Sequence, residues 1–151
     1  MPIIPISIVI FARNVTSSGL ELWMQRREEL GPLNGLLEFP GGKIEANEDS
    51  VGAASREVAE EVGIKVNENH IRLFKIYTHH YEDRSVSLFS HLCLQASELG
   101  EQGWLKVSFE KPLANFESKI PEANKQIIID ICAYLQELSA TKTLEELWAI
   151  S

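Results

Sequence analysis

Several features are scarce in this sequence, and each scarcity excludes a class of protein. The 151 residues include only two cysteines. Because Cys93 and Cys132 lie far apart inside apolar stretches, neither a zinc site nor a redox pair is expected, and we predict two reduced, buried thiols. Long apolar runs are also lacking. The stretch 3–12 is too short to span a bilayer and has no basic leader, so it predicts a buried strand and no membrane partner.

Basic residues are also few. With 14 lysines and arginines against 22 acidic residues, the formal net charge is −8, which argues against a broad basic surface that holds nucleic acid. An anionic substrate is not excluded, because bound metal ions reverse the local field. The length and a hydrophobic content of 44% suit a single domain, residues 1–151. We expect a cytoplasmic protein, and the sequence leaves open whether it is a monomer or a homodimer.

The most informative feature of the sequence is an acidic segment, residues 42–64, in which glycines, glutamates and an arginine stand at fixed spacings. Its fixed positions are Gly42, Glu48, Arg56, Glu57, Glu60, Glu61 and Gly63, with aliphatic residues at 58 and 64. At average residue usage, this combination arises at a given start with a probability on the order of 10⁻⁹. Chance therefore does not explain it.

The spacing of the glutamates predicts a metal site. Residues three and four apart share one face of a helix, so Glu57, Glu60 and Glu61 project their carboxylates into one small volume. Such close like charges are unfavourable unless a cation lies among them. Oxygen ligands suit Mg²⁺ or Mn²⁺ rather than zinc. For Arg56, two interpretations stay open: it orients one of the carboxylates, or it forms an i,i+4 ion pair with Glu60.

The same segment predicts a helix that packs against a core. Its apolar stripe is Val51, Ala54, Val58 and Val62. Asp49 or Ser50 can cap the start, and Gly63 suits a left-handed residue at the end. Upstream, we expect Pro40-Gly41-Gly42 to interrupt the preceding strand, and glycines without Cβ atoms let a polyphosphate or metal approach the backbone.

Alternating apolar residues and turn signals predict the other elements. The expected strands are 6–13, 20–26, 36–39, 71–81, 85–95 and 103–107, with 71–81 and 85–95 forming an antiparallel pair. A helix is expected over 121–138, with Ile127, Ile131, Tyr134, Leu135 and Leu138 buried, and a short helix over 143–150, where Thr143 and Glu146 form a capping-box pattern. Helices on both sides of a mixed sheet make an α/β sandwich.

The segment 42–64 resembles the Nudix box at every defined position. The resemblance implies the Nudix fold, a mixed β-sheet sandwiched between α-helices, and hydrolysis of a nucleoside diphosphate linked to a group X. By motif position, it implies that Glu57, Glu60 and Glu61 hold Mg²⁺, for which Mn²⁺ can substitute, and that Gly41 lends its carbonyl to the metal. It also implies that Arg56 orients a catalytic glutamate and that a carboxylate takes a proton from the attacking water.

Three features outside the box are similar to the MutT branch of the family, which hydrolyses 8-oxo-dGTP or dGTP to the monophosphate and pyrophosphate. The segment 37–45, which contains Phe39, is one. The segment 120–124 is similar to an element in which an asparagine, here Asn124, reads the purine base. Arg27 aligns with a residue that contacts the nucleotide. The resemblance thus implies that Arg27, Phe39 and Asn124 bind substrate.

Each of these residues also has a structural interpretation. Asn124 can bond to local backbone in the first turn of its helix, and Phe39 can belong to the core. Arg26 and Arg27 alternate along a strand, so one of them faces away from any site. His79, His80 and His91 are expected in the core or at its rim, although His79 or Tyr81 could instead stack on a base or ribose.

One departure from the MutT pattern affects the choice of general base. That pattern has a glutamate just before the tryptophan of the strand after the hairpin, whereas this chain has Gly103 before Trp104. Either Glu101 takes over the role, or proton transfer falls to a box glutamate such as Glu60.

The box leaves the group X open. The first choice is a MutT-like hydrolase of guanine deoxynucleotides. An RNA 5′-pyrophosphohydrolase is the main alternative, and another hydrolase of nucleoside-diphosphate-X compounds, such as ADP-ribose or a nucleotide sugar, is a third. A catalytically silent nucleotide sensor is disfavoured, because all three helix glutamates are present.

Overall fold

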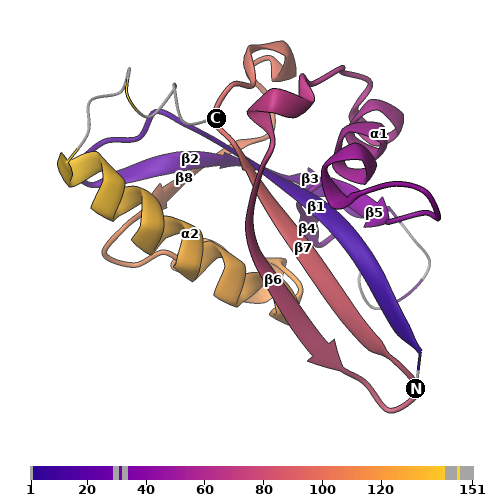
Figure 1. Ribbon diagram of the computed structural model, residues 1–151. Coiled ribbons are helices and arrows are strands. Elements are labelled where there is room, and N and C mark those ends of the chain that lie inside the picture. The colour runs from indigo at the N-terminus through magenta and orange to yellow at the C-terminus, as the bar shows by residue number, and fades with distance from the viewer. Residues whose placement is uncertain (1, 29–30, 32–33, 142–145, 147–151) are drawn as a thin grey trace. The chain divides into compact units, whose positions relative to one another are not determined.

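The computed structural model describes residues 2–28, 31, 34–141 and 146. Its contacts divide the chain into two compact units. The first comprises Met1–Phe11 and Pro40–Leu99, and the second comprises Ala12–Phe39 and Gly100–Ile150. Strand β1 (Ile3–Arg13) runs from the first unit into the second (Figure 1). The expectation of a single domain over 1–151 stays a prediction.

The first unit is a mixed sheet with one long helix. Its elements, besides β1, are β5 (Gly41–Lys43), α1 (Ser50–Val62), the short helices η1 (Glu68–His70) and η2 (Ser97–Leu99), β6 (Arg72–His80) and β7 (Ser85–Cys93). Strand β7 lies parallel to β1, whereas β5 is antiparallel to β1 and β6 is antiparallel to β7. The expected hairpin of β6 and β7 is confirmed.

The centre of β1 is fully buried. Val9, Ile10 and Phe11 are each 0% exposed, so this strand shows a continuous apolar run instead of alternation, as strands covered on both faces do. The predicted buried strand near the N-terminus is therefore confirmed. His91, its neighbour on β7, is also 0% exposed, which confirms the core interpretation of that histidine.

Helix α1 begins and ends where its sequence predicts. The Asp49 side chain accepts a hydrogen bond from the Gly52 amide at 2.7 Å, and Gly63 ends the helix with φ of 80°. Ala54 and Val58, from the expected stripe, are 0% exposed. Ala53 is fully buried as well, whereas Val51 and Val62 at the two ends are half-buried.

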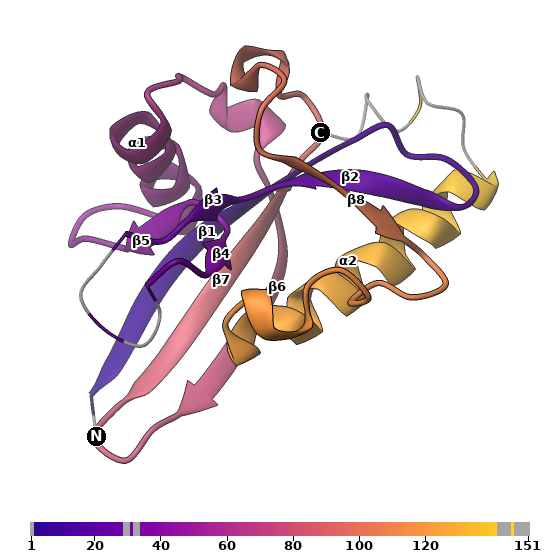
Figure 2. The same ribbon diagram turned by 180° about the vertical axis from the view of Figure 1, so that it is seen from behind.

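The second unit contains the end of β1, two strands of the same six-stranded sheet, a separate two-stranded sheet and the C-terminal helix (Figure 2). Its elements are β2 (Gly19–Trp23), β3 (Gln25–Arg26), β4 (Leu37–Glu38), β8 (Trp104–Ser108), η3 (Glu117–Lys119) and α2 (Glu122–Thr141). Strand β2 pairs antiparallel with both Ala12–Arg13 of β1 and β8, and β3 pairs with β4. Helix α2 contacts β2. Strands of both directions with helices confirm the α/β class.

The strand before Pro40 is interrupted as expected, because β4 ends at Glu38, but Gly41 and Gly42 then form a new strand, β5, that was not predicted. Gly42 pairs with Ser7 of β1, and Gly41 pairs with Ile8. A Cβ atom on Gly41 would overlap the carbonyl of Ser7 and the side chain of Ile8. Glycine therefore serves here to bring two strands close together, a tertiary requirement that the local sequence does not reveal.

Two further expectations need correction. The strand predicted over 20–26 is split at Met24, whose amide donates to the carbonyl of Gly103 at 3.1 Å.

On α2, Tyr134 is 36% exposed and not part of the buried stripe, whereas Ile128 is fully buried. The buried side chains of α2 are Ile127, Ile128, Ile131, Cys132 and Leu135, and Leu138 is half-buried. The helix expected over 143–150 lies outside the described residues.

The two thiols are free and buried, as predicted. Burial raises the pKa of Cys93 to about 11 and that of Cys132 to about 12, so both stay protonated and unreactive at neutral pH. No helix in the described part of the chain combines the length and the hydropathy that a bilayer crossing needs.

The left-handed end of α1 gives a test of the fold. A Cβ atom on Gly63 would meet no atom within 4 Å, so only backbone conformation opposes a side chain there. Gly63→Ala should lower the free energy of unfolding by about 1–2 kcal/mol, because L-residues disfavour φ of this sign. Gly63→Asn should lose clearly less, since asparagine tolerates it. Urea denaturation measures both, and equal losses would contradict the assignment.

Candidate active site

The guanidinium of Arg56 is the centre of the acidic segment. It grips the Glu48 carboxylate with two hydrogen bonds, from Nη2 at 2.8 Å and from Nε at 2.9 Å. Its Nη1 donates to Glu57 at 2.9 Å and to Glu60 at 3.3 Å. Nη2 also donates to the carbonyl of Lys43 at 2.9 Å. One cation thus joins the loop before α1, strand β5 and the helix itself.

These contacts combine both interpretations of Arg56. The i,i+4 pair with Glu60 is present, but it is longer than the bonds to Glu48 and Glu57, and the Glu60 side chain is 59% exposed. The Glu48 and Glu57 side chains are only 17% and 15% exposed. Sequence reasoning gave Glu48 no role of its own. The structure makes it the bidentate anchor of Arg56, a geometry that fixes the guanidinium plane.

The ion pair of Arg56 with Glu48 also determines their charges. The hydrogen bond from Arg56, followed by that from the Glu45 amide, lowers the pKa of Glu48 to about 2. The same bond to Glu48 raises the pKa of Arg56 above its ordinary value. Both groups are therefore ionised across the physiological pH range.

Two helix glutamates lie against strand β5. The Glu57 carboxylate occupies the space that a Cβ atom on Gly42 would take, which explains why this position holds glycine. Glu61 accepts a hydrogen bond from the Gly41 amide at 3.2 Å. Helix α1 runs beside β5 in both views (Figures 1 and 2). Glu57 and Glu61 thus lie beside Gly42 and Gly41, and their role as metal ligands stays a prediction.

The donor chemistry of this cluster fits a hard divalent cation. Four glutamates, Glu48, Glu57, Glu60 and Glu61, surround one arginine and a glycine backbone, so the cluster carries excess negative charge. Carboxylate and carbonyl oxygens are the ligands that Mg²⁺ and Mn²⁺ prefer. Within the described residues, no three His, Cys, Asp or Glu side chains converge closely enough to enclose an ion, so ligation by all three predicted glutamates requires side-chain rotation.

The residues predicted to bind substrate belong to the second unit, whereas the glutamate cluster belongs to the first. Arg27 is 39% exposed and pairs with Glu38 at 3.2 Å, and Arg26 donates to the carbonyl of Gly35 at 3.0 Å. Phe39 is 4% exposed, as its core interpretation requires.

Asn124 lies in the first turn of α2, and its backbone N–H donates to the carbonyl of Pro121 at 2.9 Å. Among the described residues, the side chain of Asn124 has no hydrogen-bond partner, so the local side-chain bond of the structural interpretation is not made. Its carboxamide is therefore available to donate and accept at once.

The departure at Gly103 has a structural cause. Gly103 has φ of 93°, and a Cβ atom there would overlap the indole of Trp23. The Trp23 indole donates to the carbonyl of Gln102 at 2.9 Å, and the Met24 amide donates to that of Gly103. These bonds hold the loop in a conformation that disfavours glutamate at 103.

Glu101, the alternative carboxylate of this loop, is bound by a residue that sequence reasoning did not single out. Arg13 contacts Glu101 at 3.2 Å and Glu21 at 2.9 Å. It also stacks over the ring of Trp104, with 4.2 Å to the centroid. The Glu101 side chain is 87% exposed, so it lies on the surface beside a cation of its own unit.

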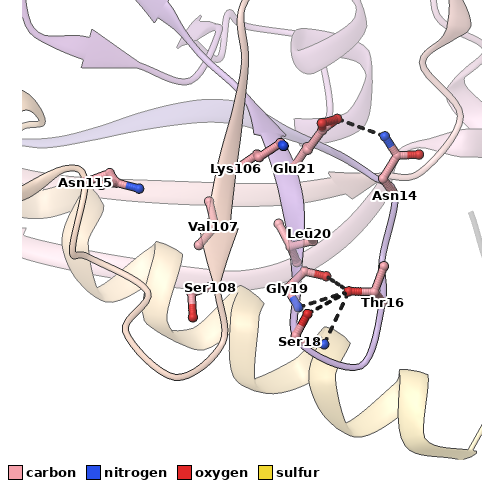
Figure 3. A pocket seen from close by; sticks show the side chains of 10 residues that line it. All are labelled: Asn14, Thr16, Ser18, Gly19, Leu20, Glu21, Lys106, Val107, Ser108 and Asn115. Carbon is pink, nitrogen blue, oxygen red and sulfur yellow. Dashed lines mark hydrogen bonds between the residues drawn. The ribbon is translucent and has the colours of Figure 1, made fainter.

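A cavity of about 530 Å³ lies in the second unit, between the turn after β1 and strand β8 (Figure 3). Leu20 and Val107 contribute apolar side chains, while Lys106 and Asn115 contribute polar ones. The turn is braced by Thr16, whose hydroxyl accepts hydrogen bonds from the amides of the turn. None of the described residues that line this cavity was predicted as a site.

Comparison with known proteins identifies the family. The NUDIX domain model matches residues 4–124, and this range includes the Arg56 cluster and Asn124. The chain belongs to the NUDIX domain family.

Individual relatives are similar over part of the chain. The 8-oxo-dGTP diphosphatase of Escherichia coli (strain K12) is 39% identical over 69 residues, which cover 46% of this chain and 52% of that protein. The 8-oxo-dGTP diphosphatase of Buchnera aphidicola subsp. Schizaphis graminum is 32% identical over 97 residues, covering 64% of this chain and 72% of that protein. The chain spans about half the length of the Escherichia coli relative, and the activity in that name is a property of the relative.

A solved structure gives a similar fold. It comes from a study of MutT from Aliivibrio salmonicida and Vibrio cholerae, with 27% identity and a TM-score of 0.58, and it covers 87% of this chain and 98% of that chain. This similarity agrees with the mixed sheet and the two helices described above.

The loop at Gly103 generates a prediction. Gly103→Glu places a carboxylate where the MutT pattern has one, yet it should lower the free energy of unfolding by about 1–3 kcal/mol, the range for a strained backbone position. Contact with the Trp23 indole adds to this loss. Gln102→Glu, one residue earlier, adds the same charge without that strain and should unfold like the wild type. A Gly103→Glu protein as stable as the Gln102→Glu control would show that the loop adapts.

Proposed function

We propose that this protein is a divalent-cation-dependent hydrolase that converts dGTP or 8-oxo-dGTP to the nucleoside monophosphate and pyrophosphate. The observation that carries the proposal is the cluster in which Arg56 holds Glu48 and Glu57 beside the glycine strand β5. The similarity to 8-oxo-dGTP diphosphatases supports the choice of substrate. The family match spans segments of both units, which supports one Nudix domain over 1–151.

The chain's own residues then have distinct tasks. Glu57, Glu60 and Glu61, with the carbonyl of Gly41, hold Mg²⁺, for which Mn²⁺ can substitute. When bound, the cation supplies positive charge to the diphosphate oxygens and lowers the pKa of the attacking water. Arg56 keeps Glu57 in one orientation through its bond at 2.9 Å. Gly42 leaves room for that carboxylate.

Glu60 is the best candidate for the general base. Its contact with Arg56 is the longest of the three within hydrogen-bonding range, at 3.3 Å, and its side chain is the most exposed of those carboxylates, at 59%. It is therefore the least restrained and the most accessible to water. Glu101 is a weaker candidate, because Arg13 holds it in an ion pair at 3.2 Å.

Asn124 provides base selection in this proposal. Its side chain has no hydrogen-bond partner among the described residues, and a carboxamide can donate to and accept from one purine edge. Arg27 contributes positive charge, partly offset by its pair with Glu38. Phe39, at 4% exposed, supports the site by packing.

Product analysis by ion exchange tests the proposal. The purified protein with Mg²⁺ is offered 8-oxo-dGTP, dGTP, the other nucleoside triphosphates, ADP-ribose and a 5′-triphosphate RNA. Monophosphate plus pyrophosphate from guanine deoxynucleotides, lost on chelation of the metal, is the expected result. Release of phosphate or pyrophosphate from the RNA alone would overturn the substrate class.

Glu60→Gln tests the chemistry. It keeps the size of the side chain but removes the charge, and we expect turnover to fall by about two to four powers of ten, the usual contribution of a general base. The fold should be retained, since Glu60 is largely exposed. Glu137→Gln, at an exposed position of α2, is the matched control. Near-normal turnover in Glu60→Gln would refute both roles given to this residue.

Asn124→Ala tests base selection. Loss of the carboxamide should lower the ratio of kcat/KM for guanine nucleotides to kcat/KM for other nucleotides. The expected change corresponds to about 1–3 kcal/mol, because a buried polar group of the base loses its hydrogen-bond partner. Asn69→Ala, at an exposed position of η1, should leave the preference unchanged. An unchanged preference in Asn124→Ala would give Asn124 a purely structural role.

A further inference from the structure

Three polar side chains of the first unit form a network that the proposed chemistry does not use. Ser7 on β1 and His91 on β7 are each 0% exposed, and Ser50 is the first residue of α1. The His91 ring lies 2.9 Å from the Ser50 hydroxyl through Nε2 and 2.9 Å from the carbonyl of Ile8 through Nδ1. The Ser7 hydroxyl donates to the carbonyl of Ser50 at 2.7 Å. We call this the Ser7–His91–Ser50 network.

The direction of each bond follows from the partners. A carbonyl only accepts, so Nδ1 of His91 carries the hydrogen that Ile8 receives. Nε2 is then the acceptor, and the Ser50 hydroxyl donates to it. Burial lowers the pKa of His91, which agrees with a neutral ring. Ser50 is thus bonded twice, through its hydroxyl and through its carbonyl, to the two central strands.

The network fixes the helix to the same part of β1 that holds strand β5. Ser7 pairs in register with Gly42, and Ile8 pairs with Gly41. The side-chain hydroxyl of Ser7 bonds to the start of α1. The distance between the helix glutamates and the glycine backbone is therefore set through two consecutive residues of β1.

We propose that Ser7, Ser50 and His91 are positioning residues of the metal site: they hold the first turn of α1 so that Glu57 and Glu61 face Gly42 and Gly41. This inference rests on the proposed function, because it assigns these residues to the same metal cluster. A buried polar network of this kind specifies one arrangement of its elements, since each unmade bond leaves a desolvated polar atom. Two of its bonds converge on the residue that begins the helix.

The experiment compares two serine-to-alanine variants of the same helix. Ser50→Ala removes the hydroxyl that reaches His91. Ser55→Ala removes a hydroxyl that bonds to the carbonyl of Val66 at 3.3 Å and takes no part in the network. Binding of Mn²⁺ is measured by electron paramagnetic resonance without nucleotide. We expect Ser50→Ala to bind Mn²⁺ about 10-fold more weakly, at the lower end of the effect of removing groups that orient metal ligands.

Further variants separate positioning from a general loss of stability. Ser50→Thr keeps the hydroxyl and should restore Mn²⁺ affinity to within about twofold of wild type, well short of the loss expected for an orienting group. If Ser50→Ala does not fold, Ser7→Ala carries the test. Its matched control is Ser90→Ala, which removes another fully buried strand serine, bonded to the carbonyl of Lys75 at 2.7 Å.

The outcomes distinguish this inference from the proposed function. Weaker Mn²⁺ binding in Ser50→Ala or Ser7→Ala, with both controls unchanged, supports it even if no guanine nucleotide is hydrolysed. Wild-type affinity in both network variants overturns it. A wild-type protein that binds no Mn²⁺ overturns the metal role of the cluster, and the inference falls with it.

Discussion

The site depends on one ion pair, between Arg56 and Glu48. A helix with glutamates at 57, 60 and 61 gathers negative charge on one face, and like charges this close oppose folding. Arg56 offsets part of that charge, and its two-bond grip on Glu48 prevents it from turning to any single helix carboxylate. In the proposed function, the remaining negative charge is what attracts the divalent cation.

Close backbone approach is the second constraint, and it explains the glycines. Gly41 must lie against Ser7 and Ile8, and Gly42 must leave space for the Glu57 carboxylate. A side chain at either position would separate β5 from β1 or displace a predicted ligand. The two glycines therefore link the sheet to the chemistry, because the strand that completes the sheet edge also provides the backbone beside the glutamates.

Features determined by local chemistry were predictable from the sequence. The Asp49 cap and the left-handed Gly63 depend on residues within one or two helical turns. Features set by distant residues were not. Strand β5 exists because β1 lies beside it, and the split at Met24 depends on a carbonyl of Gly103, far along the chain. The bidentate hydrogen bonding of Glu48 with Arg56 could not be predicted for the same reason, because no spacing rule pairs a loop carboxylate with an arginine of the following helix.

The loop around Gly103 changes how the box must be interpreted. In the MutT pattern this loop supplies a carboxylate, but here Trp23 fills that space and Arg13 binds the nearest alternative, Glu101. Releasing Glu101 would break its ion pair with Arg13 and leave Glu21 as the remaining carboxylate in the Arg13 pairs described above. Glu60 needs no such rearrangement, because it is exposed and only loosely held. Under the proposed function, the same physical constraint that removes the loop glutamate therefore moves proton transfer to the helix, so that the box would carry both metal binding and base catalysis.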